Sequence, residues 1–225
     1  MCNLYAVTKG QQAIRELTRA MHDQTGNLPP LPGIFPDYPA PIVRNQSEGR
    51  ELTVARWEMP SPVFALKGRN SDPGVTNVRN VAAPHWRRWL QIENRCVVPF
   101  TSFSENEVLP DESRPPIWFA LNETRPLAVF AGIWTRWTSV RKVKEGETTN
   151  DIFAFLTAEP NKLVGAFHPK AMPAESDAGR SDDTGRDRCV DDRTDFGIPD
   201  TSTPTAGRRS HDRSQRREEG RGRHR

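Results

Sequence analysis

Two runs of residues decide the class of fold: RCVVPF at 95–100 and LAVFAGIW at 127–134. Both are short, rich in β-branched and aromatic residues, and flanked by polar or turn-forming residues, a pattern typical of buried strands. Three further strand-like runs are Leu52–Trp57, Ile117–Leu121 and Asp151–Thr157. Many short strands with few helices predict an α+β domain with a mainly antiparallel, barrel-like sheet and short flanking helices.

Helical periodicity is confined to short stretches. Gln11–Asp23 is predicted to be an amphipathic helix, because apolar side chains recur on one face, namely Ala13, Ile14, Leu17, Ala20 and Met21. A short helix is expected over Pro84–Leu90, since proline suits a first helical turn. The prolines of LPPLPGIFPDYPAP, residues 28–41, predict an extended loop with defined bends.

Composition narrows the class of protein. The net charge of +3 is too weak by itself to indicate nucleic acid binding. The chain has no run of about 18 apolar residues and no basic region followed by an apolar run, so we expect neither a membrane span nor a signal peptide. Three cysteines, Cys2, Cys96 and Cys189, cannot form a paired framework and lack metal-ligand spacing. A cytoplasmic monomer without metal or cofactor is expected.

The chain changes character after Pro173. Residues 1–173 hold every tryptophan, tyrosine, leucine and lysine, whereas residues 174–225 hold twelve arginines, twelve acidic residues and one large aromatic, Phe196. With so few apolar groups the second part cannot offset its chain entropy, so we predict a domain over 1–173 and a disordered tail over 174–225. A translated frameshift in GC-rich DNA would explain this composition. The alternative is an arginine-rich nucleic-acid arm, against which the balancing acids argue.

Cysteine at position 2 follows Met1 directly in the opening MCNLY. Methionine aminopeptidases generally tolerate a side chain as small as cysteine, so removal of Met1 would leave a terminal 1,2-aminothiol. With an aldehyde, the amine forms an imine and the thiol then closes a five-membered thiazolidine ring. A free α-amine, with a reference pKa of about 7.7–8.0, is partly unprotonated near neutral pH, whereas a thiol near 8.5 needs a basic or cationic neighbour. The alternative is an ordinary second residue on a frayed terminus.

Three polar residues lie where loops meet the predicted strands. Asn77 precedes the Pro84 helix, Glu105 directly follows a strand, and His168 follows a strand region. The amide could orient an amine, the carboxylate could shuttle protons during imine formation, and the histidine could protonate a departing oxygen. Each has an ordinary alternative: a turn-forming asparagine, a solvated loop acid and a surface histidine.

Taken together, these segments resemble the SRAP (SOS response-associated peptidase) family, whose members crosslink to abasic sites in single-stranded DNA. The matching features are Cys2 after Met1, ARWEMPSP at 55–62, TNVRN at 76–80, RCVVPFTSFSE at 95–105, FLTAEPN at 155–161 and HPKAMP at 168–173. Their order and spacing span the whole body of the chain. The resemblance implies a fold in which the mature N-terminus lies at the floor of a DNA-binding cleft.

The resemblance also implies roles for individual residues. Cys2 would bond to the ring-opened sugar, and Asn77 would hold the terminal residue. Glu105 would transfer protons, and also assist removal of Met1, while His168 would assist ring opening and Schiff-base chemistry.

The implied DNA contacts are Arg79 to a backbone phosphate, Trp57 as a cleft aromatic on which a base stacks, and Thr157 within FLTAEPN. For Trp57, packing in the core is an equally reasonable interpretation.

The chain departs from the family pattern at several positions. Family members commonly open with MCGR, whereas Asn3 and Leu4 stand here, so a phosphate contact from position 4 is lost. Glu58 stands where glycine is usual, and its carboxylate is expected to crowd the backbone and repel phosphate. After Pro173 the usual apolar strand and helix are replaced, so we expect the sheet to lose an edge partner.

Three classes of function remain open at this stage. The first is a protein that crosslinks abasic single-stranded DNA in the SOS response, with lyase chemistry. The second is an amide hydrolase or protease with an N-terminal cysteine nucleophile. The third is a non-catalytic single-strand binder or an inactive truncated paralogue.

Overall fold

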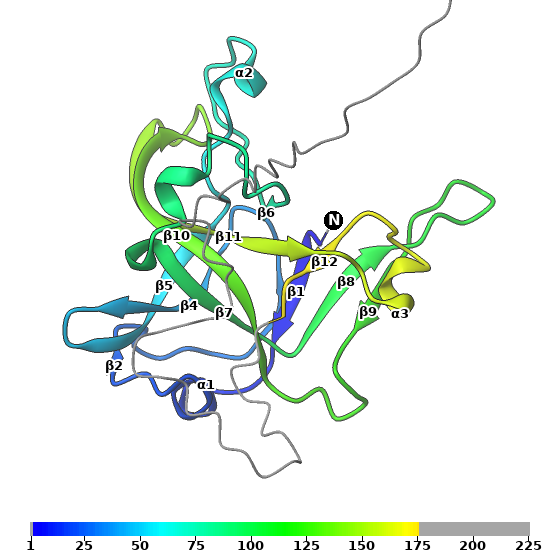
Figure 1. The fold of residues 1–225 in the computed structure, drawn as a ribbon, viewed down its shortest axis with the longest axis horizontal. Helices are drawn as coiled ribbons and strands as arrows, with labels where there is room; N and C mark the ends of the chain where they lie inside the picture. Colours follow the sequence, from blue (N-terminus) through cyan, green and yellow to red (C-terminus); the bar gives the residue numbers. More distant parts are fainter. Residues whose placement is uncertain (1, 176–225) are drawn as a thin grey trace, which may run out of the picture.

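A closed barrel forms the centre of the molecule in a computed structural model that describes residues 2–175 (Figure 1). Its strands are hydrogen-bonded in the order β5–β4–β7–β10–β11, and β11 closes the ring by pairing in parallel with β5. The other neighbours in the ring are antiparallel. The strands are β4 (Pro39–Gln46), β5 (Gly49–Trp57), β7 (Arg95–Phe100), β10 (Ala128–Val140) and β11 (Glu147–Ala158).

A smaller antiparallel sheet packs beside the barrel and carries the start of the chain. Its order is β3–β1–β8–β9, so β1 lies between β3 and β8. The strands are β1 (Leu4–Val7), β3 (Leu31–Ile34), β8 (Ser102–Asn106) and β9 (Pro116–Phe119). Thr101, between β7 and β8, donates its backbone N–H to Ala6 O at 2.7 Å. The barrel and the smaller sheet are therefore joined at the residue where β7 continues into β8.

The remaining elements are short and lie around these sheets (Figure 1). They are the strands β2 (His22–Asp23), β6 (Asn77–Val78) and β12 (Met172–Pro173), the helices α1 (Gln11–Thr18), α2 (Val63–Leu66) and α3 (Lys162–Gly165), and the 3₁₀ helices η1 (Arg87–Trp89) and η2 (Ile92–Asn94). Strands β6 and β12 both pair with β11, which thus connects the barrel to the segments around the N-terminus. Within residues 2–175, no helix has the length and apolar character needed to cross a membrane.

An aromatic cluster fills the barrel and the space under the smaller sheet. Tyr5, Trp57 and Phe155 form mutual ring contacts at 4.9–5.2 Å, and Phe130 joins them through Phe155 at 4.9 Å. All four are fully buried. Strand β1 is therefore held by packing as well as by hydrogen bonds, and fully burying each such side chain is worth about 1.5–3 kcal/mol.

Close packing of the barrel strands leaves little room for a side chain at position 132. A Cβ atom there would lie 3.0 Å from Ala154 O on β11 and 3.1 Å from Cys96 Sγ on β7. Gly132 pairs with both of these strands, opposite Phe155 and Cys96. A side chain at this position would therefore require the neighbouring atoms to shift by a few tenths of an ångström.

The predicted α+β class with a mainly antiparallel, barrel-like sheet is confirmed, and several boundaries are corrected. Strand β7 has the predicted bounds, whereas β10 continues to Val140. The helix predicted over Gln11–Asp23 ends at Thr18, because Arg19 adopts φ 54° and His22–Asp23 pairs with β5. Pro84–Leu90 forms only the 3₁₀ turn η1, and the loop predicted at 28–41 contains β3 and the start of β4.

Chain pairing continues past the predicted domain boundary at Pro173. Ala174 donates its N–H to Leu156 O at 2.8 Å and accepts from Ala131 N at 2.8 Å, and Glu175 forms a bridge with Phe130. The ordered sheet therefore reaches at least Glu175. The rest of the tail, for which disorder is predicted, lies outside the described residues.

Replacing Ala174 with proline tests the contribution of this last connection. Ala174→Pro removes the N–H that bonds Leu156 O, so we expect the free energy of unfolding to fall by about 1–3 kcal/mol. Ala174→Val retains the N–H and is the matched control. Urea unfolding followed by tryptophan fluorescence measures both, and equal stability of the two variants would show that Ala174 does not support the sheet.

Candidate functional site

Asn77 holds the first described residue of the chain. Strand β6 places Asn77 opposite Phe155 of β11, and its side chain is only 4 % exposed. The amide Nδ2 donates to Cys2 O at 2.8 Å and to Thr76 Oγ1 at 2.7 Å. An asparagine that merely forms a turn would be exposed, so this buried contact favours a positioning role for Asn77.

The thiol of Cys2 is buried beside this contact. Cys2 is 1 % exposed, and its Sγ lies 3.5 Å from Leu4 O, to which the thiol donates. Burial raises the pKa of the Cys2 thiol to about 12, because the thiolate loses its hydration. The thiol is therefore protonated at neutral pH and needs a base before it can act as a nucleophile.

Glu105 supplies a buried carboxyl group next to Cys2. It lies within β8, one residue after Ser104, which pairs with Leu4 of β1. Glu105 is 2 % exposed, and its charge contributes to the raised pKa of the Cys2 thiol. The alternative of a solvated loop acid does not fit this burial, whereas a proton-transfer group close to Cys2 does.

His168 lies in the turn between α3 and β12. Its backbone N–H donates to Val164 O at 2.8 Å, and its ring Nδ1 lies 2.8 Å from Ala171 O. Because a carbonyl only accepts, Nδ1 carries the proton and Nε2 is the basic nitrogen of the neutral ring. Strand β12 then pairs with Thr157 and Ala158 at the end of β11. The ring is thus oriented by the segment that covers this end of β11.

Arg79 and Thr157 are neighbours across the β6–β11 pair. The register sets Leu156 opposite Val78, and Thr157 Oγ1 donates to Val78 O at 3.4 Å. Arg79, the next residue of the chain, is exposed. An exposed guanidinium two residues after Asn77 is compatible with a phosphate contact.

Trp57 has a different position from the other candidates. Its ring is fully buried against Tyr5 and Phe155, and its Nε1 donates to Thr76 O at 3.1 Å. The structure therefore agrees with the interpretation that Trp57 packs in the core. A base does not reach this ring, but the hydrogen bond supports the strand that carries Asn77.

Two departures from the family pattern are accommodated within the fold. The Leu4 side chain lies over Gly33 of β3, 3.6 Å from the position of a Cβ there, so it makes an apolar contact. Glu58 has φ 131°, which favours glycine, and is 8 % exposed. Burial raises the pKa of its carboxyl to about 7, although Arg141 lowers it. The backbone at Glu58 thus has a conformation that suits glycine, and its carboxyl group is buried beside Arg141.

Sequence reasoning missed two features of this region. Ser102 and Ser104 in β8 have buried hydroxyl oxygens, and Ser104 contacts the Cys2 thiol through its backbone. Alternation of small polar residues with phenylalanine in TSFS was the available signal. The buried Arg141 had no signal, because charged residues at strand ends are usually solvated.

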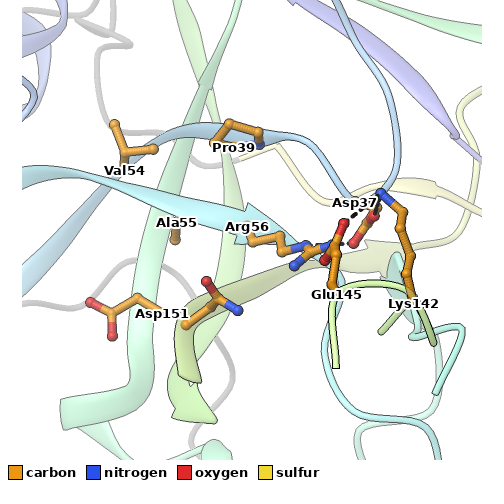
Figure 2. Close-up of a pocket in the computed structure, with 9 residues that line it drawn as sticks. Asp37, Pro39, Val54, Ala55, Arg56, Lys142, Glu145 and Asp151 are labelled. Carbon is orange, nitrogen blue, oxygen red and sulfur yellow. Dashed lines mark hydrogen bonds and ion pairs between the residues drawn. The ribbon is translucent and has the colours of Figure 1, made fainter. Parts of the chain in front are cut away.

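A cavity of 400 Å³ near β5 is lined by charged groups that neutralise one another (Figure 2). Asp37 lies between Arg56, with Nε 2.5 Å from its Oδ1, and Lys142, with Nζ 2.6 Å from its Oδ2. Glu145 accepts from Arg56 at 3.1 Å. These ion pairs connect β5 to the loop between β3 and β4 and to the turn between β10 and β11. No group of three or more potential metal ligands occurs in the described part of the chain.

Solved structures with the same fold are known. A protein from Bordetella bronchiseptica has a TM-score of 0.59 at 21 % identity, covering 79 % of this chain and 85 % of its own. A protein from Bacteroides thetaiotaomicron has 0.54 at 19 %, covering 78 % and 77 %. A phage-related protein from Bordetella bronchiseptica has 0.56 at 17 %, covering 79 % and 78 %. No curated protein matches this chain.

The chain thus forms a barrel domain in which Asn77 holds a buried Cys2. The model of the SOS response associated peptidase (SRAP) family matches residues 1–175, and the chain belongs to that family. The resemblance noted from the motifs is thus confirmed. At the level of the family, membership supports a DNA-associated role in the SOS response and in abasic-site processing.

The raised pKa of Cys2 predicts the pH dependence of its reaction with iodoacetamide. With a pKa of about 12, the thiolate fraction rises about tenfold per pH unit through neutral pH, so labelling of Cys2 should rise steadily from pH 7 to 9.5. Free cysteine is the reference, and its labelling should level off near pH 9. Peptide mass spectrometry separates Cys2 from Cys96 and Cys189, and an early plateau for Cys2 would show an activated thiol.

Proposed function

We propose that the chain, after loss of Met1, binds single-stranded DNA and forms a thiazolidine crosslink between Cys2 and an abasic site. The observation that carries the proposal is the hydrogen bond from Asn77 Nδ2 to Cys2 O, with the buried Glu105 beside it. A terminal aminothiol held in one place next to a proton-transfer group suits condensation with an aldehyde.

The proposed chemistry balances as a condensation. The Cys2 amine adds to the aldehyde carbon of the ring-opened sugar, and loss of one water gives an imine. The thiol sulfur then adds to the imine carbon while its proton passes to the imine nitrogen, which closes the ring. Glu105 accepts and returns protons in these steps, and His168 protonates the departing oxygen.

Burial of the thiol favours this order of steps. The amine reacts first because the thiol, with a pKa of about 12, is protonated at neutral pH. Once the imine has formed, the thiol is already on the same residue, so ring closure needs only a small rotation and one proton transfer. Arg79 contacts the backbone phosphate and holds the strand without reading its sequence. Thr157, whose hydroxyl donates to Val78 O, supports the segment that carries Arg79.

The role of the thiol can be separated from that of the amine by Cys2→Ser. A hydroxyl closes the ring poorly, whereas the amine still forms an imine. We expect the serine variant to lose the stable crosslink on a denaturing gel, and borohydride to recover a trapped adduct. Cys96→Ser is the control and should crosslink as the wild type does. A stable crosslink at full yield in Cys2→Ser would rule out the thiol mechanism.

Glu105→Gln and His168→Ala test the proton-transfer roles. A placed acid or base typically contributes about 10²–10⁴-fold, so each variant should slow crosslinking by a factor in this range. Affinity for single-stranded DNA without an abasic site should stay within about twofold of the wild-type value, because binding rests on phosphate contacts. Parallel loss of binding and crosslinking would make these residues structural.

A further inference from the structure

The chain between β5 and β6 leaves the barrel and returns to it, and carries α2 (Figure 1). We call residues 58–76 the 58–76 loop. At its base, Met59 and Val75 exchange both backbone hydrogen bonds, at 3.0 and 2.8 Å. Thr76 and then Asn77 follow Val75 in the chain, so the position of this base influences the position of Asn77.

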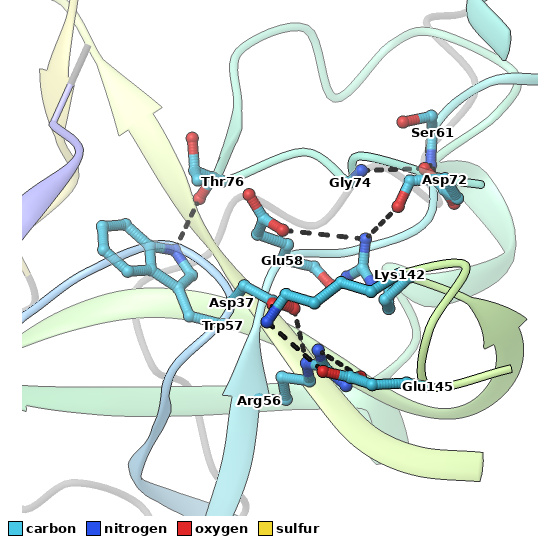
Figure 3. Close-up of polar contacts among 11 residues, drawn as sticks. Asp37, Arg56, Trp57, Glu58, Ser61, Asp72, Gly74, Thr76, Lys142 and Glu145 are labelled. Carbon is cyan, nitrogen blue, oxygen red and sulfur yellow. Dashed lines mark hydrogen bonds and ion pairs between the residues drawn. The ribbon is translucent and has the colours of Figure 1, made fainter. Parts of the chain in front are cut away.

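One buried guanidinium joins the two arms of the 58–76 loop. Figure 3 shows the residues of both arms that surround it, among them Glu58 and Asp72. Arg141 follows β10, and its side chain is 3 % exposed. Its Nη2 donates to Glu58 O in the outgoing arm, and its Nη1 donates to Asp72 O in the returning arm at 3.3 Å. Nη1 also lies 3.8 Å from the Glu58 carboxylate. A planar fork with several donors suits this bridging contact, which a lysine ammonium cannot reproduce.

The surrounding contacts leave Arg141 little freedom. The Asp72 carboxylate accepts from Ser61 N at 3.0 Å and from Gly74 N at 2.8 Å, and Asp72 N donates to Val140 O at 2.8 Å. Gly74 has φ 79°, and a Cβ atom there would collide with Arg141 Nη1 and lie 2.6 Å from Glu58 Cβ. The space around the guanidinium is therefore shaped by the loop itself.

The loop base is connected to Cys2 by an unbroken series of contacts. Thr76 O accepts from Trp57 Nε1 at 3.1 Å and from Phe155 N at 3.2 Å. Asn77 then donates from Nδ2 to Thr76 Oγ1 and to Cys2 O. A shift of the returning arm would move Thr76 and, with it, the amide that holds Cys2.

We propose that Arg141 is a positioning residue for the N-terminal site, because it bridges both arms of the 58–76 loop and thereby fixes Asn77 against Cys2. This inference rests on the proposed function. It adds to that function a residue outside the matched motifs. Arg141 touches neither Cys2 nor the DNA in this assignment; it acts on the reaction through the loop.

The experiment compares full-length variants by two readouts. Arg141→Met removes the bridge, Gly74→Ala displaces the guanidinium without changing its charge, and Arg141→Lys keeps the charge but not the fork. Arg56→Met is the matched control, because Arg56 is a half-buried arginine whose contacts are to Asp37 and Glu145. The readouts are the maximal rate of crosslinking to abasic single-stranded DNA, and the rate of Cys2 labelling by iodoacetamide without DNA.

We expect Arg141→Met and Gly74→Ala to lower the maximal crosslinking rate by about 10–100-fold. The half-saturating DNA concentration should stay within about threefold, since phosphate contacts are kept. Cys2 labelling should become at least about tenfold faster, because a loosened anchor opens the buried thiol more often. Arg141→Lys should fall between these variants and the wild type, and Arg56→Met should match the wild type.

The two readouts separate this inference from the proposed function. If the wild type forms no crosslink, the proposed function is wrong, and the labelling rates still decide whether Arg141 positions Cys2. Unchanged labelling in both Arg141→Met and Gly74→Ala, or an equal change in Arg56→Met, would overturn the inference. Should Arg141→Met fail to fold, Gly74→Ala and Arg141→Lys carry the same comparison.

Discussion

The hydrogen bond from Asn77 Nδ2 to Cys2 O is the contact on which the arrangement of the site depends. It joins residues 75 positions apart and attaches the start of the chain to the strand pair β6–β11. Chain termini usually fray unless they are held in this way. Without the contact, the amine and thiol of Cys2 would sample many positions relative to Glu105.

The barrel supports this contact through packing. Tyr5, Trp57 and Phe155 meet in one buried cluster, one from β1, one from β5 and one from β11. Trp57 also donates to Thr76 O, next to Asn77. Burial has a cost for the chemistry, because it raises the pKa of the Cys2 thiol to about 12. In the proposed reaction the buried thiol therefore needs a neighbouring base, and the buried Glu105 is the residue to which we assign this role.

Elements set by local sequence were predicted more accurately than elements set by contacts between residues distant in the chain. Strand β7 was predicted with its observed bounds, because a continuous apolar run buried on both faces is a local signal. The end of α1 was not, since Arg19 takes a left-handed conformation that is uncommon for arginine.

Strand β10 was underestimated for a different reason. Its outer half, to Val140, is partly polar and is ordered by its pairing with β11. The grouping of Cys2, Asn77 and Glu105 was predicted from the family resemblance alone, because no local sequence propensity indicates it. Arg141 carried no sequence signal, because its partners are backbone carbonyls brought together only in the fold.

The most direct test of the account is the identity of the residue that carries the DNA. After reaction with an abasic oligonucleotide, nuclease and trypsin digestion should leave a sugar remnant on the peptide of residues 2–9, beginning at Cys2. Tandem mass spectrometry should place the remnant on Cys2, with a mass equal to the sum of the two parts less one water. A remnant on a lysine, or on a peptide that still begins with Met1, would contradict the account.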